Sequence, residues 1–408
     1  MKQSLNAILF FCAAIALTSC SEEENPQFDK DTFTKIYDNN QYDASNFAID
    51  MRQTPDGGFI ILGGRIIPGD STYTGIYLMK VDEFGNFVKE MLVEGTSVNP
   101  IAGLTEYQTK YYFFCSDRTT LQAQIANVDA NLESVAMTTV QGSLTYPAAA
   151  SFIDNNFAVM GYNNADRLTT MSIVTPDAGV LAYKGFMIEP SDEVEEPIMD
   201  HFQRTGRKFP FAVGKAPNGL YYFNGFYNYT LSLVFTNMKD DEPNGVVQGS
   251  HDDGGFSAIV PVSGNKFASA RFNFGDNYLM PTREIPTSGT SGIERLGGYS
   301  LPEMVSNAKV RILRASVEQN SVQKNVLIYG TDTKSKQIGL LYYDETTGEF
   351  INSRYLGFSN PFEIASITQT ADGGLAICGM TQIAGRFGRI TVFKLSKEQL
   401  QDDIAQAK

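Results

Sequence analysis

Residues 53–63 read QTPDGGFIILG and residues 369–379 read QTADGGLAICG, so one pattern stands near both ends of the chain. Each copy places a tight turn between two apolar runs, and Gly recurs there because such turns need positive φ. Weaker copies bring the turn positions to residues 56, 107, 154, 218, 264, 323 and 372, a period of about 53 residues. The pattern predicts repeated units that each begin with a β-hairpin.

Several of these hairpins are followed by a second one. Residues 76–82 turn through 83–86 into 87–91, and similar runs follow at 123–129, 171–177 and 340–344. Four short strands per unit at this period are typical of a β-propeller blade. Solenoid repeats are the main competitor, but they are usually shorter and mostly carry one or two strands or helices. The sequence therefore predicts an all-β protein, a β-propeller of seven four-stranded blades.

The two ends of the repeat region predict how the ring closes. The last repeat stops after its third strand (389–395), and a lone strand-like piece (32–37) precedes the first repeat. Placed as the outer strand of the final blade, this N-terminal strand would close the ring and remove exposed sheet edges. We expect the propeller over 32–398 and a C-terminal tail over 399–408. Six or eight blades remain open alternatives because residues 270–320 are irregular.

The N-terminus reads as an export signal, with Lys2 before an apolar run that ends at Leu17. The run is too short to span a bilayer core of about 30 Å, which takes about 20 residues. Residues 17–20 (LTSC) resemble the lipobox of bacterial lipoproteins, and the acidic SEEE that follows resembles the surface-export signal of Bacteroidota lipoproteins. The resemblance implies a signal peptide over 1–19, an acylated (palmitate) Cys20, a lipidated tether over 20–31, and a cell-surface place on the outer membrane. A plain secretory signal is the alternative.

The amino-acid composition argues against several classes of function. With 32 Lys+Arg against 46 Asp+Glu the net charge is −14, which argues against nucleic acid because neutralising phosphates takes clustered cations. Two His and four Cys leave most zinc, haem and His-dependent chemistries short of residues, so we expect no metal and no cofactor. Cys115 and Cys378 lie in apolar runs of distant repeats and are expected to be buried, unpaired thiols; a disulfide is the alternative.

The hairpin pattern followed by YLMKVDEFGN (77–86) resembles the repeats of bacterial secreted propellers with Asp-Gly-Gly hairpins. The resemblance covers most of residues 32–396, strongly in the first and last repeats and loosely between them. It implies the fold, which hosts binding modules, scaffolds and enzymes alike. Surface lipoproteins of this export class often accompany SusC/SusD-type nutrient importers, so a SusC/SusD-like outer-membrane transporter complex is the suspected partner by analogy.

Long loops predict where a ligand or partner binds. In a propeller, the loops between second and third strands and between blades share one face, and insertions at 65–73, 187–208 and 274–304 are expected there. The basic, aromatic HFQRTGRK (201–208) either contacts an anionic group or folds on the acidic stretch before it. GFYNY (225–229) is either a stacking platform or part of the core. The candidate binding residues are Arg65, Tyr73, His201, Arg204, Arg207, Tyr227, Tyr229 and Tyr278.

Signatures of catalysis are weak. The sequence has no Gly-x-Ser-x-Gly elbow and no P-loop, and neither His201 nor His251 has a partner at metal-ligand spacing. We expect a non-enzymatic accessory or binding subunit of an uptake complex for peptides or oligosaccharides. A stand-alone glycan- or peptide-binding lipoprotein and a propeller hydrolase or lyase acting on polysaccharide are the alternatives. The absence of Trp weighs against sugar capture, since Trp offers the largest stacking face.

Overall fold

Short antiparallel strands make up most of the structure, a computed structural model that describes residues 29–38, 45–67, 72–189, 194–203, 208–250, 254–319, 322–358, 360–383 and 387–405. Residues 31–408 form one unit. The predicted signal peptide (1–19), the predicted acylated Cys20 and most of the predicted tether lie outside the described residues. No described helix is long and apolar enough to cross a membrane.

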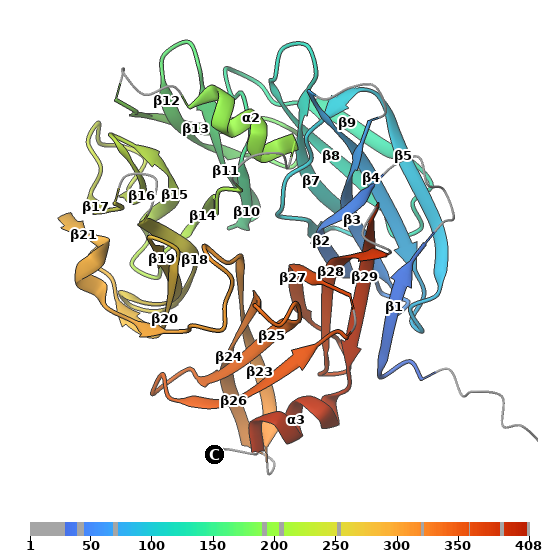
Figure 1. Ribbon diagram of the computed structural model, residues 1–408. Coiled ribbons are helices and arrows are strands. Elements are labelled where there is room, and N and C mark those ends of the chain that lie inside the picture. The colour runs from blue at the N-terminus through green and yellow to red at the C-terminus, as the bar shows by residue number, and fades with distance from the viewer. Residues whose placement is uncertain are drawn as a thin grey trace, which may run out of the picture. The chain divides into compact units, whose positions relative to one another are not determined.

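The strands form six sheets, each built mainly of hairpins between consecutive strands. Figure 1 shows the sheets following one another around a common centre. In chain order the groups are β2 (Asn46–Gln53), β3 (Phe59–Ile66), β4 (Thr74–Val81) and β5 (Phe87–Val98); β6 (Thr105–Tyr107), β7 (Lys110–Asp117), β8 (Ala123–Asp129) and β9 (Val135–Thr139); β10 (Ala149–Ile153), β11 (Asn156–Asn163), β12 (Leu168–Val174) and β13 (Val180–Met187); β14 (Ala212–Lys215), β15 (Tyr221–Tyr227), β16 (Thr230–Thr236) and β17 (Gly245–Gln248); β18 (Gly254–Ser263), β19 (Lys266–Asn273), β20 (Asp276–Glu284) and β22 (Tyr299–Ser300); β23 (Val310–Gln319), β24 (Val322–Asp332), β25 (Ile338–Asp344) and β26 (Phe350–Leu356); and β27 (Phe362–Gln369), β28 (Leu375–Ile383), β29 (Phe387–Leu395) and β1 (Phe33–Tyr37).

The all-β propeller prediction is confirmed, and the N-terminal strand closes the ring as expected. Strand β1 pairs antiparallel with β29, from Phe33 opposite Lys394 to Tyr37 opposite Ile390. The largest sheet has eight strands because β5 joins β7 through two residue pairs, Ser97 with Asp117 and Val98 with Ser116. Divided there, the described strands fall into the seven groups above; counted as bonded sheets they number six. The blade number therefore stays a prediction.

The repeated hairpin turn carries a buried lysine. Lys80 Nζ lies 2.8 Å from Asp56 Oδ1, and Lys394 Nζ lies 2.5 Å from Asp372 Oδ2 in the corresponding turn at the other end of the chain. Both ammonium groups are buried, whereas the carboxylates stand at the surface. Burial alone would raise the pKa of Asp56, but hydrogen bonds from Lys80 and Thr54 hold that pKa below its usual value. The QTxDGG pattern therefore forms a tight turn, and its Asp also binds a lysine of the third strand.

The hydrophobic core lies between neighbouring sheets. Met51 and Ile61 of the first sheet pack against Ala376, Cys378 and Val392 of the last one. Burial raises the pKa of the Cys378 thiol well above its usual value. Cys115 is likewise buried, and burial raises its pKa to about 12. Both cysteines are free, so the prediction of two unpaired thiols is confirmed.

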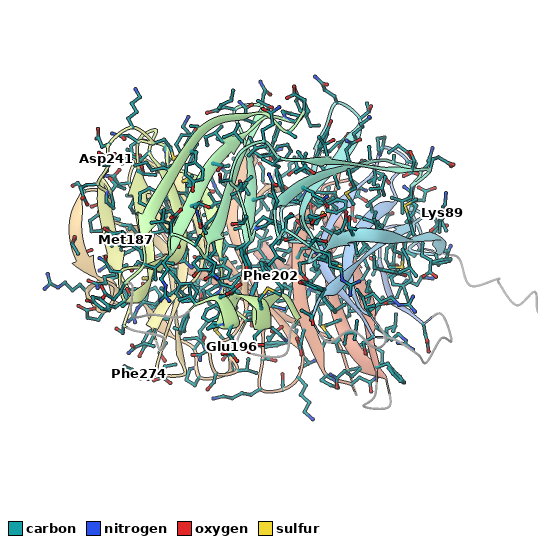
Figure 2. The ribbon with its side chains drawn as sticks, turned by 90° about the horizontal axis from the view of Figure 1, so that it is seen from above. Lys89, Met187, Glu196, Phe202, Asp241 and Phe274 are labelled. Carbon is teal, nitrogen blue, oxygen red and sulfur yellow. The ribbon has the colours of Figure 1, made fainter. Side chains whose placement is uncertain are left out.

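The propeller has two faces because its strands alternate in direction. The hairpin turns 54–58 and 370–374 lie on one, here called the turn face. The loops 164–167 and 228–229 and the connection with helix α2 (Glu195–Gln203) lie on the other, here called the loop face. Figure 2 shows Glu196 and Phe274 at one edge of the ring and Asp241, in a turn between third and fourth strands, at the other.

Two predicted boundaries need correction. The insertion expected at 274–304 on the loop face instead begins with strand β20, which ends at Glu284; β21 (Gly289–Gly292) then runs parallel to β17 from the turn face, and the 3₁₀ helix η2 (Ile293–Leu296) and β22 follow. The tail expected over 399–408 starts inside helix α3 (Lys397–Ala405). Leu400 and Ile404 of α3 are buried, so apolar packing extends this unit beyond the expected boundary at residue 398.

Asp56→Ala and Asp372→Ala should each lower the free energy of unfolding by about 2 to 3 kcal/mol, because each leaves a buried ammonium, Lys80 or Lys394, without its carboxylate. Urea denaturation of the purified protein measures the loss. Asp177→Ala is the matched control, because Asp177 accepts a bond from Thr175 in a similar turn without a lysine. We expect it to cost about 1 kcal/mol or less. Equal losses in all three variants would show that the lysines contribute little.

Candidate functional site

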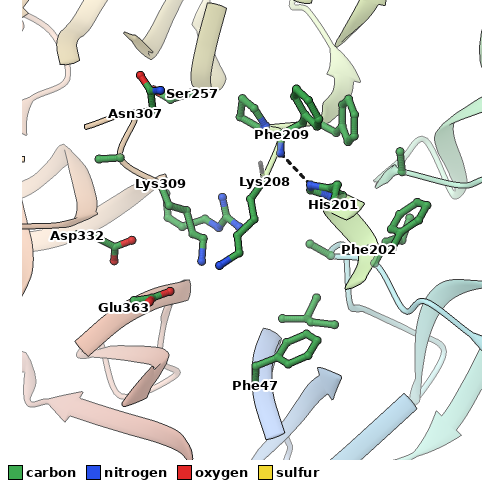
Figure 3. Close-up of a pocket in the computed structure, with 18 of the residues that line it drawn as sticks. Phe47, His201, Phe202, Lys208, Phe209, Ser257, Asn307, Lys309, Asp332 and Glu363 are labelled. Carbon is green, nitrogen blue, oxygen red and sulfur yellow. Dashed lines mark hydrogen bonds between the residues drawn. The ribbon is translucent and has the colours of Figure 1, made fainter. Parts of the chain in front are cut away.

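A cavity of about 400 Å³ opens at the centre of the ring on the loop face. It is lined by the first residues of inner strands, by the ends of second strands, and by the connection that contains α2. Its charged side chains are Lys208, Lys309, Arg311, Asp332 and Glu363. Figure 3 shows this cavity, with Lys309, Asp332 and Glu363 on one side, the ring of Phe47 on another, and Lys208 reaching in from the connection beside His201 and Phe209.

The aromatic wall of the cavity comes from the insertion between β13 and β14. Val194, Ile198 and Phe202 repeat every four residues, so they share one face of α2, and all three are buried. Thr74 Oγ1 donates a 2.8 Å hydrogen bond to the Phe202 carbonyl, which ties the helix to β4 on the far side of the ring. This bond holds α2, the described helix of the predicted loop-face insertion, at the wall of the cavity.

His201 holds the chain that follows α2. The Phe209 amide donates a 2.8 Å hydrogen bond to His201 Nδ1 (Figure 3), so this nitrogen carries no proton. The imidazole ring also packs against the rings of Phe202, Phe209 and Phe211, with centroids 5.6, 6.2 and 5.0 Å away. His201 therefore lines the cavity as a neutral, positioned side chain.

Two cations on the opposite wall join adjacent sheets. Lys309 Nζ donates to the Ile364 carbonyl at 3.0 Å, and Arg311 Nε donates to the Ala365 carbonyl at 2.6 Å. These carbonyls belong to β27, whereas the cations stand at the start of β23. Burial lowers the pKa of Arg311, and the nearby carboxylates of Asp50 and Asp332 oppose that shift. Lys309 and Arg311 thus form hydrogen bonds across the junction between β23 and β27, and they place positive charge at the ring centre.

Two carboxylates stand beside these cations. The Ile364 amide donates to Asp332 Oδ1 at 2.7 Å. Burial raises the pKa of Asp332 to about 6; Glu363 adds to the rise, while Lys309 and Arg311 oppose it. Glu363 makes no side-chain hydrogen bond or ion pair with another described residue, although it lines the cavity. The site thus holds charges of both signs, and the Glu363 carboxylate has no hydrogen-bond or ion-pair partner among the described residues.

One buried hydroxyl also faces this site without a partner. Ser257 lines the cavity and is 5% exposed, and its Oγ forms no hydrogen bond within the described structure. A buried polar atom without a partner costs free energy, so such atoms often mark a place where a ligand binds. Within the described ranges, no three His, Cys, Asp or Glu side chains gather as they would around a metal ion.

The structure separates the candidate binding residues. His201 lines the central cavity, whereas Arg65 lines a second pocket of about 360 Å³ between β4 and β5. Tyr73 lies near that pocket, with the Arg118 guanidinium 5.4 Å from its ring centroid. Arg204 and Arg207 lie outside the described residues.

The remaining three tyrosines stand apart from the cavity. Tyr227 is half-buried at the end of β15, and Tyr229 is exposed in the turn that follows. The ring of Tyr278 stacks 4.0 Å from the buried Arg271 guanidinium, which is a packing contact. No shared site therefore forms from these side chains among the described residues.

Sequence reasoning missed Lys309, Arg311, Asp332 and Glu363, whereas Lys208 ends the predicted basic stretch 201–208 but was not among the candidate binding residues. Each stands at or near the end of an apolar strand or loop, at distances in sequence that follow no local period. The available signal was a charged residue at the boundary of a strand that is otherwise apolar, as in Lys309-Val310-Arg311.

No family model and no curated protein matches this chain. Among solved structures it is similar to the β-propeller domain of the trilobed protease from Pyrococcus furiosus, with a TM-score of 0.45, 9% identity, and coverage of 86% of this chain and 95% of that one. It is similar to BamB from Moraxella catarrhalis, with a TM-score of 0.37, 10% identity, and coverage of 89% and 98%. It is also similar to a protein of unknown function from Bacteroides caccae, with a TM-score of 0.35, 9% identity, and coverage of 82% and 83%.

Asp332→Asn should change the pH dependence of stability. With a pKa raised to about 6, Asp332 binds more protons in the folded than in the unfolded protein between about pH 4 and pH 6, so its ionisation destabilises the fold as pH rises. Relative to the unmodified protein, the variant should gain about 1 to 2 kcal/mol of unfolding free energy from pH 4 to pH 7, less than the full shift because the cavity is open to solvent.

Urea denaturation at several pH values measures this difference. Asp56→Asn is the control with the opposite sign, since the pKa of Asp56 is lowered and its stabilisation is lost as pH falls. A difference between Asp332→Asn and the unmodified protein that stays constant with pH would contradict the expectation.

Proposed function

We propose that the protein is a non-enzymatic, lipid-anchored outer-membrane surface lipoprotein that binds a small nutrient in its central cavity as a subunit of an uptake complex. The observation that carries the proposal is the cavity, which combines a mouth on the loop face, an aromatic wall and five charged side chains. Ligand sites are concave and combine apolar surface with placed polar groups, and this cavity has both kinds of lining.

The size and polarity of the cavity favour a small ligand. Its volume of about 400 Å³ lies toward the lower end of the range for small-molecule sites, so it suits a short peptide or a short oligosaccharide. The phenyl rings of Phe47, Phe202 and Phe209 offer apolar contact, and the chain has no Trp. The charged groups favour a peptide, since its charged termini would form stronger, charge-assisted hydrogen bonds with them than neutral sugar hydroxyls would.

The course of β1 shows on which face the chain enters the propeller. Lys35 Nζ donates to Asn86 Oδ1 in a turn of the turn face, and Phe33 lies opposite Lys394, whose ammonium reaches Asp372 in another such turn. The chain therefore enters the propeller on the turn face. With a lipid at Cys20, the loop face would remain available for a ligand and for a transporter partner.

One alternative function has an observation in its favour. Asp332 and Glu363 stand together at the cavity, and the raised pKa of Asp332 suits a general acid near neutral pH. This pair is the place where a propeller hydrolase or lyase would act on a glycan. Turnover of a glycan that is abolished in Asp332→Asn and Glu363→Gln would favour the enzyme over the binding subunit.

We expect a detergent pull-down of the tagged, full-length protein from native outer membranes to recover a SusC/SusD-like pair in fixed ratio, identified by mass spectrometry. The reason is that a lipoprotein that delivers cargo must remain beside the transporter. The Cys20→Ala variant is the control: loss of the acyl chains should move it out of the membrane fraction and reduce recovery of the pair. Recovery of the unmodified protein without any transporter would instead support a stand-alone binding lipoprotein.

A further inference from the structure

The cavity is electrostatically unlike the protein around it. Three cations, Lys208, Lys309 and Arg311, face two carboxylates, Asp332 and Glu363, while the whole chain carries a net charge of −14. Figure 3 shows the Lys208 and Lys309 side chains extending from opposite walls toward the same space. Two ammonium groups that converge in a partly desolvated cavity repel each other, and an anionic group between them would turn that repulsion into attraction.

The carboxylates of Asp332 and Glu363 would instead bind a cationic group. Glu363 accepts no hydrogen bond from any described residue, and Asp332 receives one, from the Ile364 amide. Both come from elements on the Lys309 side of the cavity, whereas Lys208 comes from the connection that follows α2 (Figure 3). An ammonium has three donors and no acceptor, so one such group satisfies both carboxylates at once.

Ligands of a single charge fit this arrangement poorly. An anion would face Asp332 and Glu363, whereas a cation would face Lys208 and Lys309. A neutral sugar would supply no charged partner to Lys208 or to Glu363, so it would gain only the weaker, neutral kind of hydrogen bond there. A molecule with a positive and a negative end satisfies both sets, and charge-assisted hydrogen bonds at both ends are the stronger kind.

We propose that the central cavity binds a short peptide with free termini. Its carboxylate lies between Lys208 and Lys309, and its ammonium binds Glu363 and Asp332. Side chains of the peptide pack against the wall formed by Phe47, Phe202 and Phe209. The unpartnered Oγ of the buried Ser257 is available to a backbone group of the peptide. This inference rests on the proposed function, because it takes the cavity as the ligand site.

The test uses the full-length protein in detergent and a mixed pool of dipeptides with free termini. Two further pools contain the same dipeptides, N-acetylated in one and C-amidated in the other. Maltotriose serves as the neutral sugar probe. The readout is the probe concentration that gives a half-maximal rise in the thermal unfolding midpoint. We expect the free pool to act at about 10- to 100-fold lower concentration than either blocked pool, since each block removes one charged partner.

Two variants assign the ends of the peptide. Glu363→Gln should weaken the response to the free pool about 10- to 100-fold and leave the response to the N-acetylated pool unchanged. Lys208→Met should weaken the response to the free pool by a similar factor and leave the response to the C-amidated pool unchanged. Lys89→Met and Glu133→Gln are the matched controls and should change neither response, because they alter an exposed pair between β5 and the β8–β9 turn.

Equal responses to free and blocked pools, or no response to any peptide, would overturn the inference. A response to maltotriose that is lost in Glu363→Gln and Lys208→Met would also overturn it, yet would leave the cavity as the site of nutrient binding. Failure of the uptake role is separate, since it appears as the absence of a transporter in the pull-down. Peptide binding by a protein recovered without a transporter would therefore uphold this inference and contradict only the uptake role.

Discussion

Each sheet of the ring buries its faces against two neighbours, so the whole core depends on the first and last sheets meeting. Strand β1 makes that junction by pairing along β29, and the buried Arg389 adds a 2.9 Å ion pair with Asp38 just beyond the strand. The core between β2–β4 and β28–β29 then packs as it does between any other neighbouring sheets. Without β1, the edge of β29 would be left unpaired beside the first sheet.

Closure also creates the chemistry at the centre. The inner strands converge there, and backbone carbonyls at their ends need donors that a neighbouring strand does not supply. Lys309 and Arg311 supply them to Ile364 and Ala365 across the seam between β23 and β27. Asp332 accepts from the Ile364 amide in the same seam. The charges that line the cavity are thus also the groups that satisfy the backbone where sheets meet, which fixes their positions.

The fold could be predicted because its signals are local. The QTxDGG turn depends on residues a few positions apart, since Asp56 accepts from Thr54 and from the Gly58 amide, and this holds again at Asp372. The C-terminal helix was not predicted as part of the domain because its docking is not local. Asp403 accepts two bonds from Arg354, at 2.6 and 2.7 Å, and another from Tyr342.

The site was predicted less well, for the same reason. Loop length pointed to the insertion that carries His201, and the structure places that residue in the cavity. Lys309 and Asp332 come together because β23 pairs with β24, and Glu363 joins them only because the ring places the start of β27 beside that hairpin, which no spacing along the chain indicates. Tyr278 was predicted as a binding residue because of its aromatic ring, but in the structure that ring stacks on the Arg271 guanidinium.

The two walls of the cavity differ in how they are held. Lys309, Asp332 and Glu363 stand on strands whose backbone is paired on both sides or bonded across the seam. Lys208 follows an insertion held by the buried face of α2, by the bond from Thr74 to Phe202, and by the bond from Phe209 to His201. A ligand that bridged the two walls would therefore contact Lys208 through the insertion that α2 holds in place, and Asp332 and Glu363 through paired strands.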